Sequence, residues 1–324
     1  MSQQTEYSLK IDVRRAARRL EQYIKETVES NHTNGVLIGL SGGIDSAVLA
    51  TVAVGALGSE KVKASFLYDQ TSEKNSQQLA SLTADWLGME LGLYDIEPAM
   101  RERKVYSHAI MRIASLSRIL NRLTARLYRL LCGQSPFVSS LYAGSCDSKK
   151  AGKDFYSFGM GYITASFNAR HIYRRQLLEK IAGEKNLLLL GAANRSECMV
   201  GWFVKDGIDD LPFSPLMGLY KTQIRQLAEH LDLPGPICSQ VPSPDMLKGV
   251  TDEQQIGISY AVLDTILDCL ESGLGDEEIA AATGATKKQI THVRSINRLS
   301  EWKRKSPHQP VPADGGIKGG LRIP

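Results

Sequence analysis

The chain has 324 residues, 43% of them hydrophobic and 23% charged, with a net charge of +4 at neutral pH. These values are typical of a soluble globular protein, and the sequence offers no N-terminal signal region or membrane-spanning apolar stretch, so we expect a cytoplasmic protein. Five cysteines without a CxxC pair argue against a disulfide framework and against a zinc site.

Helices alternate with short apolar strands over the first part of the chain. Strands are expected over 35–40, 62–69, 91–96 and 186–192. Helices are expected over 10–30, 46–57, 75–88 and 168–183. Strands separated by helices pair in parallel, so the predicted fold class is α/β with a doubly wound, mostly parallel sheet. Ligands bind at the carboxyl ends of such strands, where residues 40–46 and 192–197 fall.

The chain is mainly helical after residue 220. Further helices are expected over 220–232, 252–272, 276–283 and 287–302. We therefore expect a single domain over 1–310 with a helical C-terminal part, followed by an irregular tail rich in Pro and Gly over 311–324.

Residues 41–46, with the sequence SGGIDS, join the first predicted strand to a helix that begins near Ile44. Two glycines allow close backbone approach, and the free N–H groups of a helix start bind phosphate oxygens. The segment lacks the lysine of a Walker A loop. A carboxylate repels phosphate, so Asp45 is best explained as a ligand of Mg²⁺ that bridges to the phosphates. The alternative is a tight strand-to-helix turn without a ligand.

SGGIDS resembles the signature of the N-type ATP pyrophosphatases, and further motifs follow it in order. They are GAANRSECMVGWFVKDG (191–207), PLMGLYKTQIRQLAEHLDLP (215–234), PSPDM (242–246), TDEQQIGISYAVLDTIL (251–267) and RLSEWKRKSPHQP (298–310). SGGIDS alone indicates the superfamily, whereas the ordered set resembles the ammonia-dependent NAD synthetase family.

The resemblance implies an amide ligase that uses ATP as a co-substrate. The carboxylate of deamido-NAD would attack the α-phosphate of ATP to give an adenylate and pyrophosphate, and ammonia would then displace AMP. Fewer than fifty residues precede the SGGIDS segment, too few for a glutaminase domain, so free ammonia or ammonia from a separate subunit is expected.

The same resemblance assigns roles to residues of the ATP site. ATP would be bound by Gly39, Leu40, Ser41, Gly42, Gly43, Ile44, Asp45, Ser46, Lys221 and Ser243. Mg²⁺ would be held by Asp45 and Glu197, with phosphate and water completing its shell. Lys221 would neutralise phosphate charge as pyrophosphate leaves, which makes Asp45, Lys205 and Lys221 the predicted catalytic residues. The structural alternatives are a helix-start carboxylate for Glu197, a solvated lysine for Lys221 and a turn serine for Ser243.

The dinucleotide side departs from the family pattern. Arg170, Lys205, Trp302 and Lys303 are the predicted substrate-binding residues, with Trp302 where the family has His. Ala192 replaces a Thr of the family, and Ile208 and Pro212 replace two aspartates. The chain therefore either binds deamido-NAD through altered contacts or is a related adenylate-forming amide ligase for a different carboxylate. A third hypothesis is an ATP-binding protein without catalytic activity.

A basic insertion over about 101–158 separates the two halves of the family pattern. Residues 101–131 carry eight Arg or Lys and one Glu, with leucines at helical spacing. Such a helix packs on its own domain or on a dimer mate, or contacts a membrane surface or a protein partner. No nucleic-acid binding is expected, because aromatic residues are not interleaved. Residues 133–158 are expected to form a mobile loop, a candidate lid over the site.

Two further features follow from the resemblance. The pattern over 276–296 is similar to a helix-turn-helix, but NAD synthetases carry a C-terminal helical segment of this type, which is the favoured explanation. Members of the family are typically homodimers, so a homodimer is expected.

Overall fold

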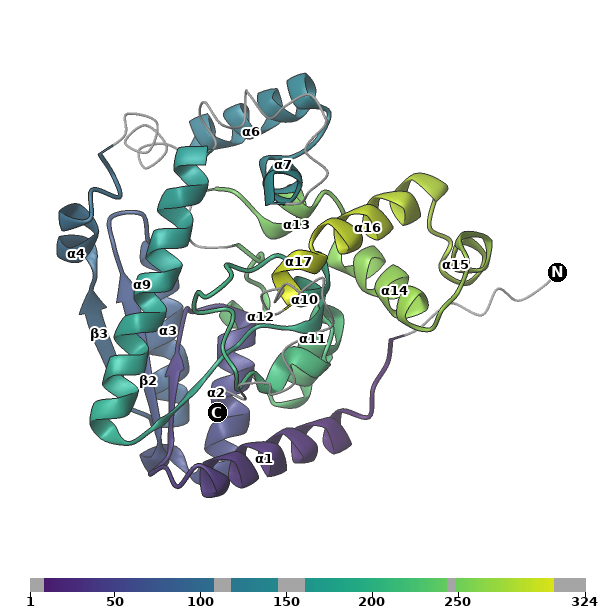
Figure 1. Cartoon of the computed structure of the whole chain (residues 1–324). Coiled ribbons are helices and arrows are strands. Elements are labelled where there is room, and N and C mark those ends of the chain that lie inside the picture. Colours follow the sequence, from purple (N-terminus) through teal and green to yellow (C-terminus); the bar gives the residue numbers. More distant parts are fainter. Residues whose placement is uncertain (1–8, 108–117, 145–160, 244–248, 306–324) are drawn as a thin grey trace, which may run out of the picture.

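A computed structural model of the chain describes residues 9–107, 118–144, 161–243 and 249–305 (Figure 1). Its centre is a four-stranded parallel sheet in the order β3-β2-β1-β4. The strands are β1 Val36–Gly39, β2 Val62–Tyr68, β3 Leu91–Asp95 and β4 Leu188–Leu190. All four predicted strands and their parallel pairing are confirmed.

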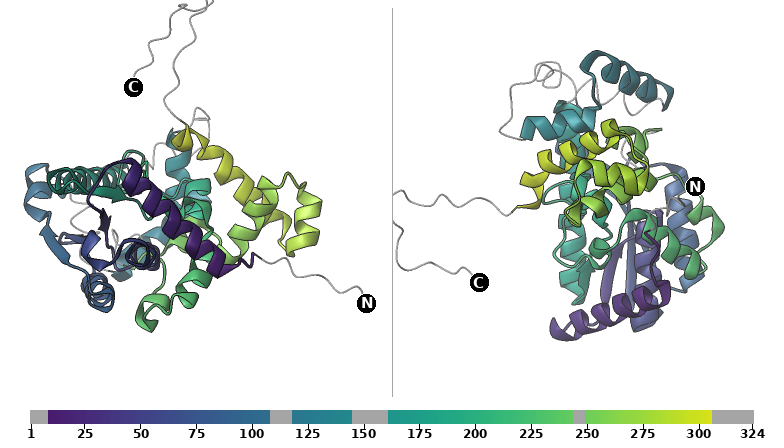
Figure 2. Two further views of the ribbon diagram at one scale, coloured as in Figure 1. Left: turned by 90° about the horizontal axis from the view of Figure 1, so that it is seen from below. Right: turned by 90° about the vertical axis from the view of Figure 1, so that its right-hand side faces the viewer.

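Helices cover both faces of the sheet (Figure 2). On one face lie α1 Val13–Ser30, α2 Ile44–Leu57, α3 Lys74–Leu87 and α11 Lys221–His230. On the other lie α4 Glu97–Glu102 and α9 Gly161–Lys185. Val36 and Ile38 of β1 pack toward the first group and Leu37 toward the second. A strand that is apolar toward both sides must be covered on both, which explains the predicted and confirmed doubly wound arrangement.

The C-terminal helices form a second apolar core beside the sheet. They are α10 Arg195–Val200, α13 Asp252–Ile256, α14 Tyr260–Glu271, α15 Asp276–Thr283 and α16 Lys287–Leu299, and the short α17 Glu301–Arg304 follows them without a buried residue. The expected helix over 252–272 is two helices, because Gly257 adopts a φ of +90° at the end of α13. Ile279 of α15 and Ile290 of α16 are buried in this core, so the 276–296 segment packs within the protein.

Shorter elements connect these layers. They are a 3₁₀ turn at Ser59–Lys61, another at Pro215–Gly218, and α12 Gly235–Cys238.

The insertion contains two helices among its described residues, α6 Arg118–Cys132 and α7 Pro136–Gly144. The basic helix is thus confirmed over its second half. The prediction of a loop from residue 133 was wrong for 136–144, because Phe137, Val138 and Leu141 are buried against the C-terminal core and need a helix to share one face. Residues 108–117, the remainder of the expected lid at 145–158, and the tail 311–324 lie outside the described residues. None of the helices in the described ranges is long and apolar enough to cross a membrane.

Candidate active site

The SGGIDS segment lies at the carboxyl end of β1, where it turns into α2. Gly42 has a φ of +81°, and a Cβ atom on it would lie 2.2 Å from the carbonyl oxygen of Ser76. Only glycine fits this position. Serine hydroxyls hold the turn together, since Ser41 N donates to Ser46 Oγ at 3.2 Å and Ser46 Oγ donates to the carbonyl oxygen of Gly43 at 2.9 Å.

The start of α2 is suited to an anion. The first N–H groups of a helix have no partner within it and carry the positive end of the helix dipole. Helix α2 begins at Ile44, directly after the glycine turn, and its body is buried in the core of the sheet. A phosphate group that reaches this turn therefore meets fixed N–H donors.

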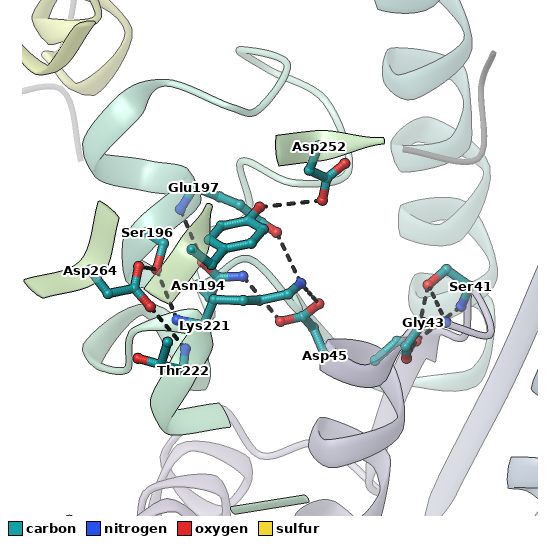
Figure 3. A network of polar contacts seen from close by, with 12 residues as sticks. Ser41, Gly43, Asp45, Asn194, Ser196, Glu197, Lys221, Thr222, Asp252 and Asp264 are labelled. Carbon is teal, nitrogen blue, oxygen red and sulfur yellow. Dashed lines mark hydrogen bonds and ion pairs between the residues drawn. The ribbon is translucent and has the colours of Figure 1, made fainter. Parts of the chain in front are cut away.

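Asp45, Glu197 and Lys221 come together beside this turn (Figure 3). The side chain of Lys221 is nearly fully buried, with 2% of the residue exposed, and its Nζ contacts Asp45 Oδ2 and lies 3.5 Å from Glu197 Oε1. Asn194 links the carboxylates: its Nδ2 donates to Asp45 Oδ1 at 3.0 Å, and its Oδ1 accepts from the backbone N of Glu197 at 3.0 Å. Motifs that are 149 residues apart are thus joined in one site.

The charged groups of this cluster shift one another's pKa values. Burial raises the pKa of Glu197 to about 8, with the Asp45 charge acting in the same direction and Lys221 opposing both. Burial also opposes the charge of Lys221, but the Asp45 and Glu197 carboxylates outweigh it and raise the pKa of the lysine above its usual value. The lysine therefore stays charged.

Asp264 holds the elements that present these side chains, although sequence reasoning did not single it out. It is fully buried and accepts from Ser196 Oγ at 2.6 Å and from Thr222 N at 2.9 Å, while Ser196 Oγ in turn accepts from Lys221 N at 2.8 Å. One carboxylate on α14 thus fixes the first turns of α10 and α11 relative to each other. The only signal in the sequence was an aspartate in an otherwise apolar helical stretch.

A cavity of about 900 Å³ extends from the phosphate turn across the molecule. Most of the predicted site residues line it: Gly39, Leu40, Ser41, Gly43, Ile44, Asp45, Ser46, Glu197, Lys205, Lys221, Ser243, Trp302 and Lys303. Gly42 and Arg170 are not among the lining residues. Gly42 shapes the turn through its backbone conformation and has no side chain that could face the cavity.

Arg170 is placed inside the protein. It is fully buried, contacts Thr71 Oγ1, and its Nη1 lies 3.7 Å from Asp69 Oδ2. Burial acts against the Asp69 charge, but the Arg174 and Arg170 charges prevail and lower the pKa of this carboxyl. The geometry therefore gives Arg170 a structural role in place of the predicted contact with substrate, and Arg174, one turn further on, lines the cavity.

The far end of the cavity combines basic and aromatic groups. Lys303 donates from Nζ to the carbonyl oxygens of Gly201, at 2.7 Å, and Phe203. Burial lowers the pKa of Lys303 to about 8. Lys205 donates from Nζ to the carbonyl oxygen of Lys305 at 3.2 Å, and the exposed Trp302 also lines the cavity. This end offers nitrogen donors and one exposed ring to a ligand.

His171 and Asp209 also line the cavity and were missed from the sequence. His171 Nδ1 lies 2.8 Å from Asp209 Oδ2, and its ring stacks on Phe167 at 4.7 Å. Asp209 follows Ile208, the position where the family pattern has an aspartate, so an acidic group is present one residue later. Pro212 does not line the cavity.

The parallel sheet, the glycine turn and the carboxylate–lysine cluster define an α/β protein of the adenine nucleotide alpha hydrolase-like fold. Solved structures agree on this fold. The NMN synthetase from Francisella tularensis superposes with a TM-score of 0.65 at 22% identity over 93% of this chain and 99% of that chain. The NH₃-dependent NAD synthetase from Campylobacter jejuni, in complex with the nitrate ion, gives 0.64 at 22% identity over 93% and 100%.

Sequence relatives identify the family. A family model described as NAD synthase matches residues 16–126 and 153–307. An NH₃-dependent NAD⁺ synthetase of Thermotoga maritima is 32% identical over 288 residues, which are 88% of this chain and 95% of the relative. One of Hyperthermus butylicus is 32% identical over 308 residues, covering 94% and 93%. The chain belongs to the NAD synthase family, and the predicted resemblance is confirmed.

Proposed function

We propose that the protein is an ammonia-dependent NAD synthetase, a C–N ligase that uses ATP to amidate deamido-NAD. The observation that carries the proposal is one continuous cavity lined by two chemically different sets of residues. One set is the glycine turn with Asp45, Glu197 and Lys221, and the other is a pair of lysines with an aromatic ring. Such a cavity can hold two nucleotides with the reacting groups between them.

The chain's own residues suit the first half-reaction. The N–H groups of the α2 start would orient the phosphates of ATP, and the buried Lys221 ammonium would balance the negative charge that grows on the departing pyrophosphate. Because Lys221 is already fixed by its carboxylate partners and by α11, it needs little rearrangement to act. The product of this step is the acyl adenylate, which ammonia converts to the amide with release of AMP.

We further propose that Asp45 and Glu197 hold Mg²⁺. Their oxygen atoms fit the ion, and both converge on one cationic group, the Nζ of Lys221, so they are close enough to bind one metal together. No group of three metal-binding side chains occurs within the described ranges, which agrees with a metal that takes its remaining ligands from phosphate and water. When bound, the metal would neutralise phosphate charge.

The identity of the acyl substrate is tested by comparing carboxylates. Purified protein is given ATP, Mg²⁺ and ammonium with deamido-NAD, with nicotinate mononucleotide, or with buffer, and pyrophosphate and the amide product are measured. We expect release that depends on deamido-NAD, with NAD formed in equal amount. Preference for another carboxylate would support the alternative amide ligase, which Ala192 and Ile208 on the cavity wall favour. Asp45→Asn should abolish turnover in either case.

Helix α6 is proposed as the contact between two copies of the chain. Leu123, Leu127, Leu130 and Leu131 are 55–82% exposed. Arg122 and Arg129 donate to the backbone carbonyl oxygens of Gly249 and Gln254 and so are directed at the protein, which favours a protein partner over an anionic membrane surface.

Light scattering tests this dimer. Wild-type protein should have twice the chain mass, and Leu127→Glu should lower it. Binding of the wild type to anionic vesicles would instead support a contact of α6 with a membrane surface.

The cytoplasmic location stays a prediction, which cell fractionation tests.

A further inference from the structure

Asp252 is a third carboxylate of the cavity, and neither the ATP site nor the metal site uses it. It begins α13, is 4% exposed and lines the cavity. Its Oδ2 accepts from Tyr260 Oη at 3.3 Å. Its Oδ1 is buried and has no hydrogen-bond partner within the part of the chain that the structure describes.

The ordinary structural explanation does not account for this side chain. A carboxylate in the first turn of a helix is stabilised by the helix dipole, but α13 has only five residues and its capping box is formed by Thr251 and Gln254. A buried carboxylate oxygen without a partner is costly. Among the described residues, no Lys or Arg lies within ion-pair distance of Asp252, although the Lys221 charge and a hydrogen bond with Trp202 act on its carboxyl. Its Oδ1 can therefore still accept from a small donor in the cavity.

Asp252 lies close to the reacting groups. The Tyr260 ring separates it from Lys221, whose Nζ is 5.4 Å from the centre of that ring. The hydroxyl of the same tyrosine donates to Asp252, so one side chain contacts the carboxylate with its hydroxyl and the lysine with its ring. A small cation at Asp252 Oδ1 would therefore lie in the same cavity as Asp45, Glu197 and Lys221.

We propose that Asp252 Oδ1 binds the ammonium ion that supplies the nitrogen of the amide. This rests on the proposed function, because ammonia in neutral water is almost wholly ammonium and must be captured and deprotonated. One proton passes from ammonium to the Asp252 carboxylate. The nitrogen lone pair then forms the C–N bond with the acyl carbon, and the C–O bond to AMP breaks with its electron pair on the phosphate oxygen. The second proton passes from the nitrogen to water, and Asp252 then returns its own proton to water. Burial raises the pKa of Asp252 to about 6, which suits a temporary proton acceptor.

The two half-reactions separate this role from a structural one. Exchange of labelled pyrophosphate into ATP in the presence of deamido-NAD requires adenylation but no ammonium. Asp252→Asn keeps the shape and removes the charge, and Asp252→Ser is measured in parallel so that the test does not depend on one variant folding. Asp276→Asn, which removes an exposed first-turn aspartate from α15, is the matched control.

We expect Asp252→Asn to raise the KM for ammonium at least tenfold and to leave the exchange rate within twofold of wild type. Hydroxylamine, a nucleophile uncharged at neutral pH, should react with the adenylate equally well in both proteins. An unchanged KM for ammonium, or a parallel loss of exchange in both Asp252 variants, would overturn the assignment. Wild-type protein that shows no exchange with deamido-NAD would instead refute the proposed function, and this site with it.

Discussion

Gly42 is the position where the phosphate turn depends most sharply on a missing side chain. Its φ of +81° belongs to the left-handed region, where an alanine costs about 1–3 kcal/mol. Its hypothetical Cβ would lie 2.2 Å from the carbonyl oxygen of Ser76, a backbone atom in the first turn of α3 that cannot rotate away. Relieving this overlap requires displacement of the turn from α3, for which overpacking costs of about 1–3 kcal/mol apply.

Gly43 provides the matched comparison, because it lies in the same turn without these restraints. Its φ of −85° is open to any residue, and a Cβ there would meet only the flexible Ser41 hydroxyl at 3.3 Å. Gly43 is the N-cap of α2, so alanine should cost at most about 1 kcal/mol. The two variants differ by one methyl group at adjacent positions and separate the effect of backbone geometry from that of loop composition.

Thermal unfolding and ATP binding measure the difference. We expect Gly42→Ala to lose about 2–6 kcal/mol of unfolding free energy, to melt about 3–9 °C lower, and to bind ATP at least tenfold more weakly. Gly43→Ala should stay within threefold of wild type in ATP affinity. Equal stability and equal ATP binding in the two variants would refute the reasoning, because the close approach to Ser76 would then have no energetic consequence.

Three further substitutions test residues in and around the site. Asp264→Asn should lower the unfolding free energy by about 1–3 kcal/mol in urea titrations, because an NH₂ group replaces one of two acceptors that bind Ser196 and the start of α11. Arg170→Met should cost about 2–4 kcal/mol, since Asp69 loses one of its two arginine partners, while the KM for deamido-NAD stays the same; a raised KM at unchanged stability would contradict its structural role. Lys303 has a pKa of about 8 in the folded protein, against an ordinary value of 10.5. Between these two pH values the unfolded chain binds more protons than the folded chain. The free energy of unfolding should therefore rise with pH across this range by up to about 3 kcal/mol. Lys303→Met should remove that rise.

The fold could be predicted because its signals are local. The run Val36–Gly39 is apolar toward both faces, as a central parallel strand requires, and the glycine turn follows it directly. Predictions failed where a single residue or a tertiary contact decided the outcome. Gly257 ends α13 through its positive φ inside an apparently continuous helical pattern. Helix α7 forms because Leu141 reaches a core built from residues more than a hundred positions away.

Some residues of the site could likewise be predicted from local sequence motifs, whereas others depend on tertiary contacts. Asp45, Glu197 and Lys221 lie in motifs that the sequence displays, and the structure brings all three together. Asp264 depends on a contact with a serine 68 residues away, which no local pattern indicates. Arg170 was singled out from the sequence as a substrate contact, but it lies on a buried face of α9. The sequence places this arginine on a helix and does not reveal which face of the helix is buried.

The charges of Asp45, Lys221 and Glu197 depend on one another. A buried ammonium is stable only with its partners in place, and removal of one partner leaves the other charge buried and unpaired. Lys221 has two carboxylate partners, and Asp45 is held a second time by Asn194, so each substitution in this set disturbs three side chains at once. At the far end, by contrast, Lys205 and Lys303 donate to backbone carbonyl oxygens, which do not change with sequence. Substitution of an uncharged lining residue such as Ile208 or Trp302 leaves these lysine contacts in place, so substrate choice can vary while the charged cluster is retained.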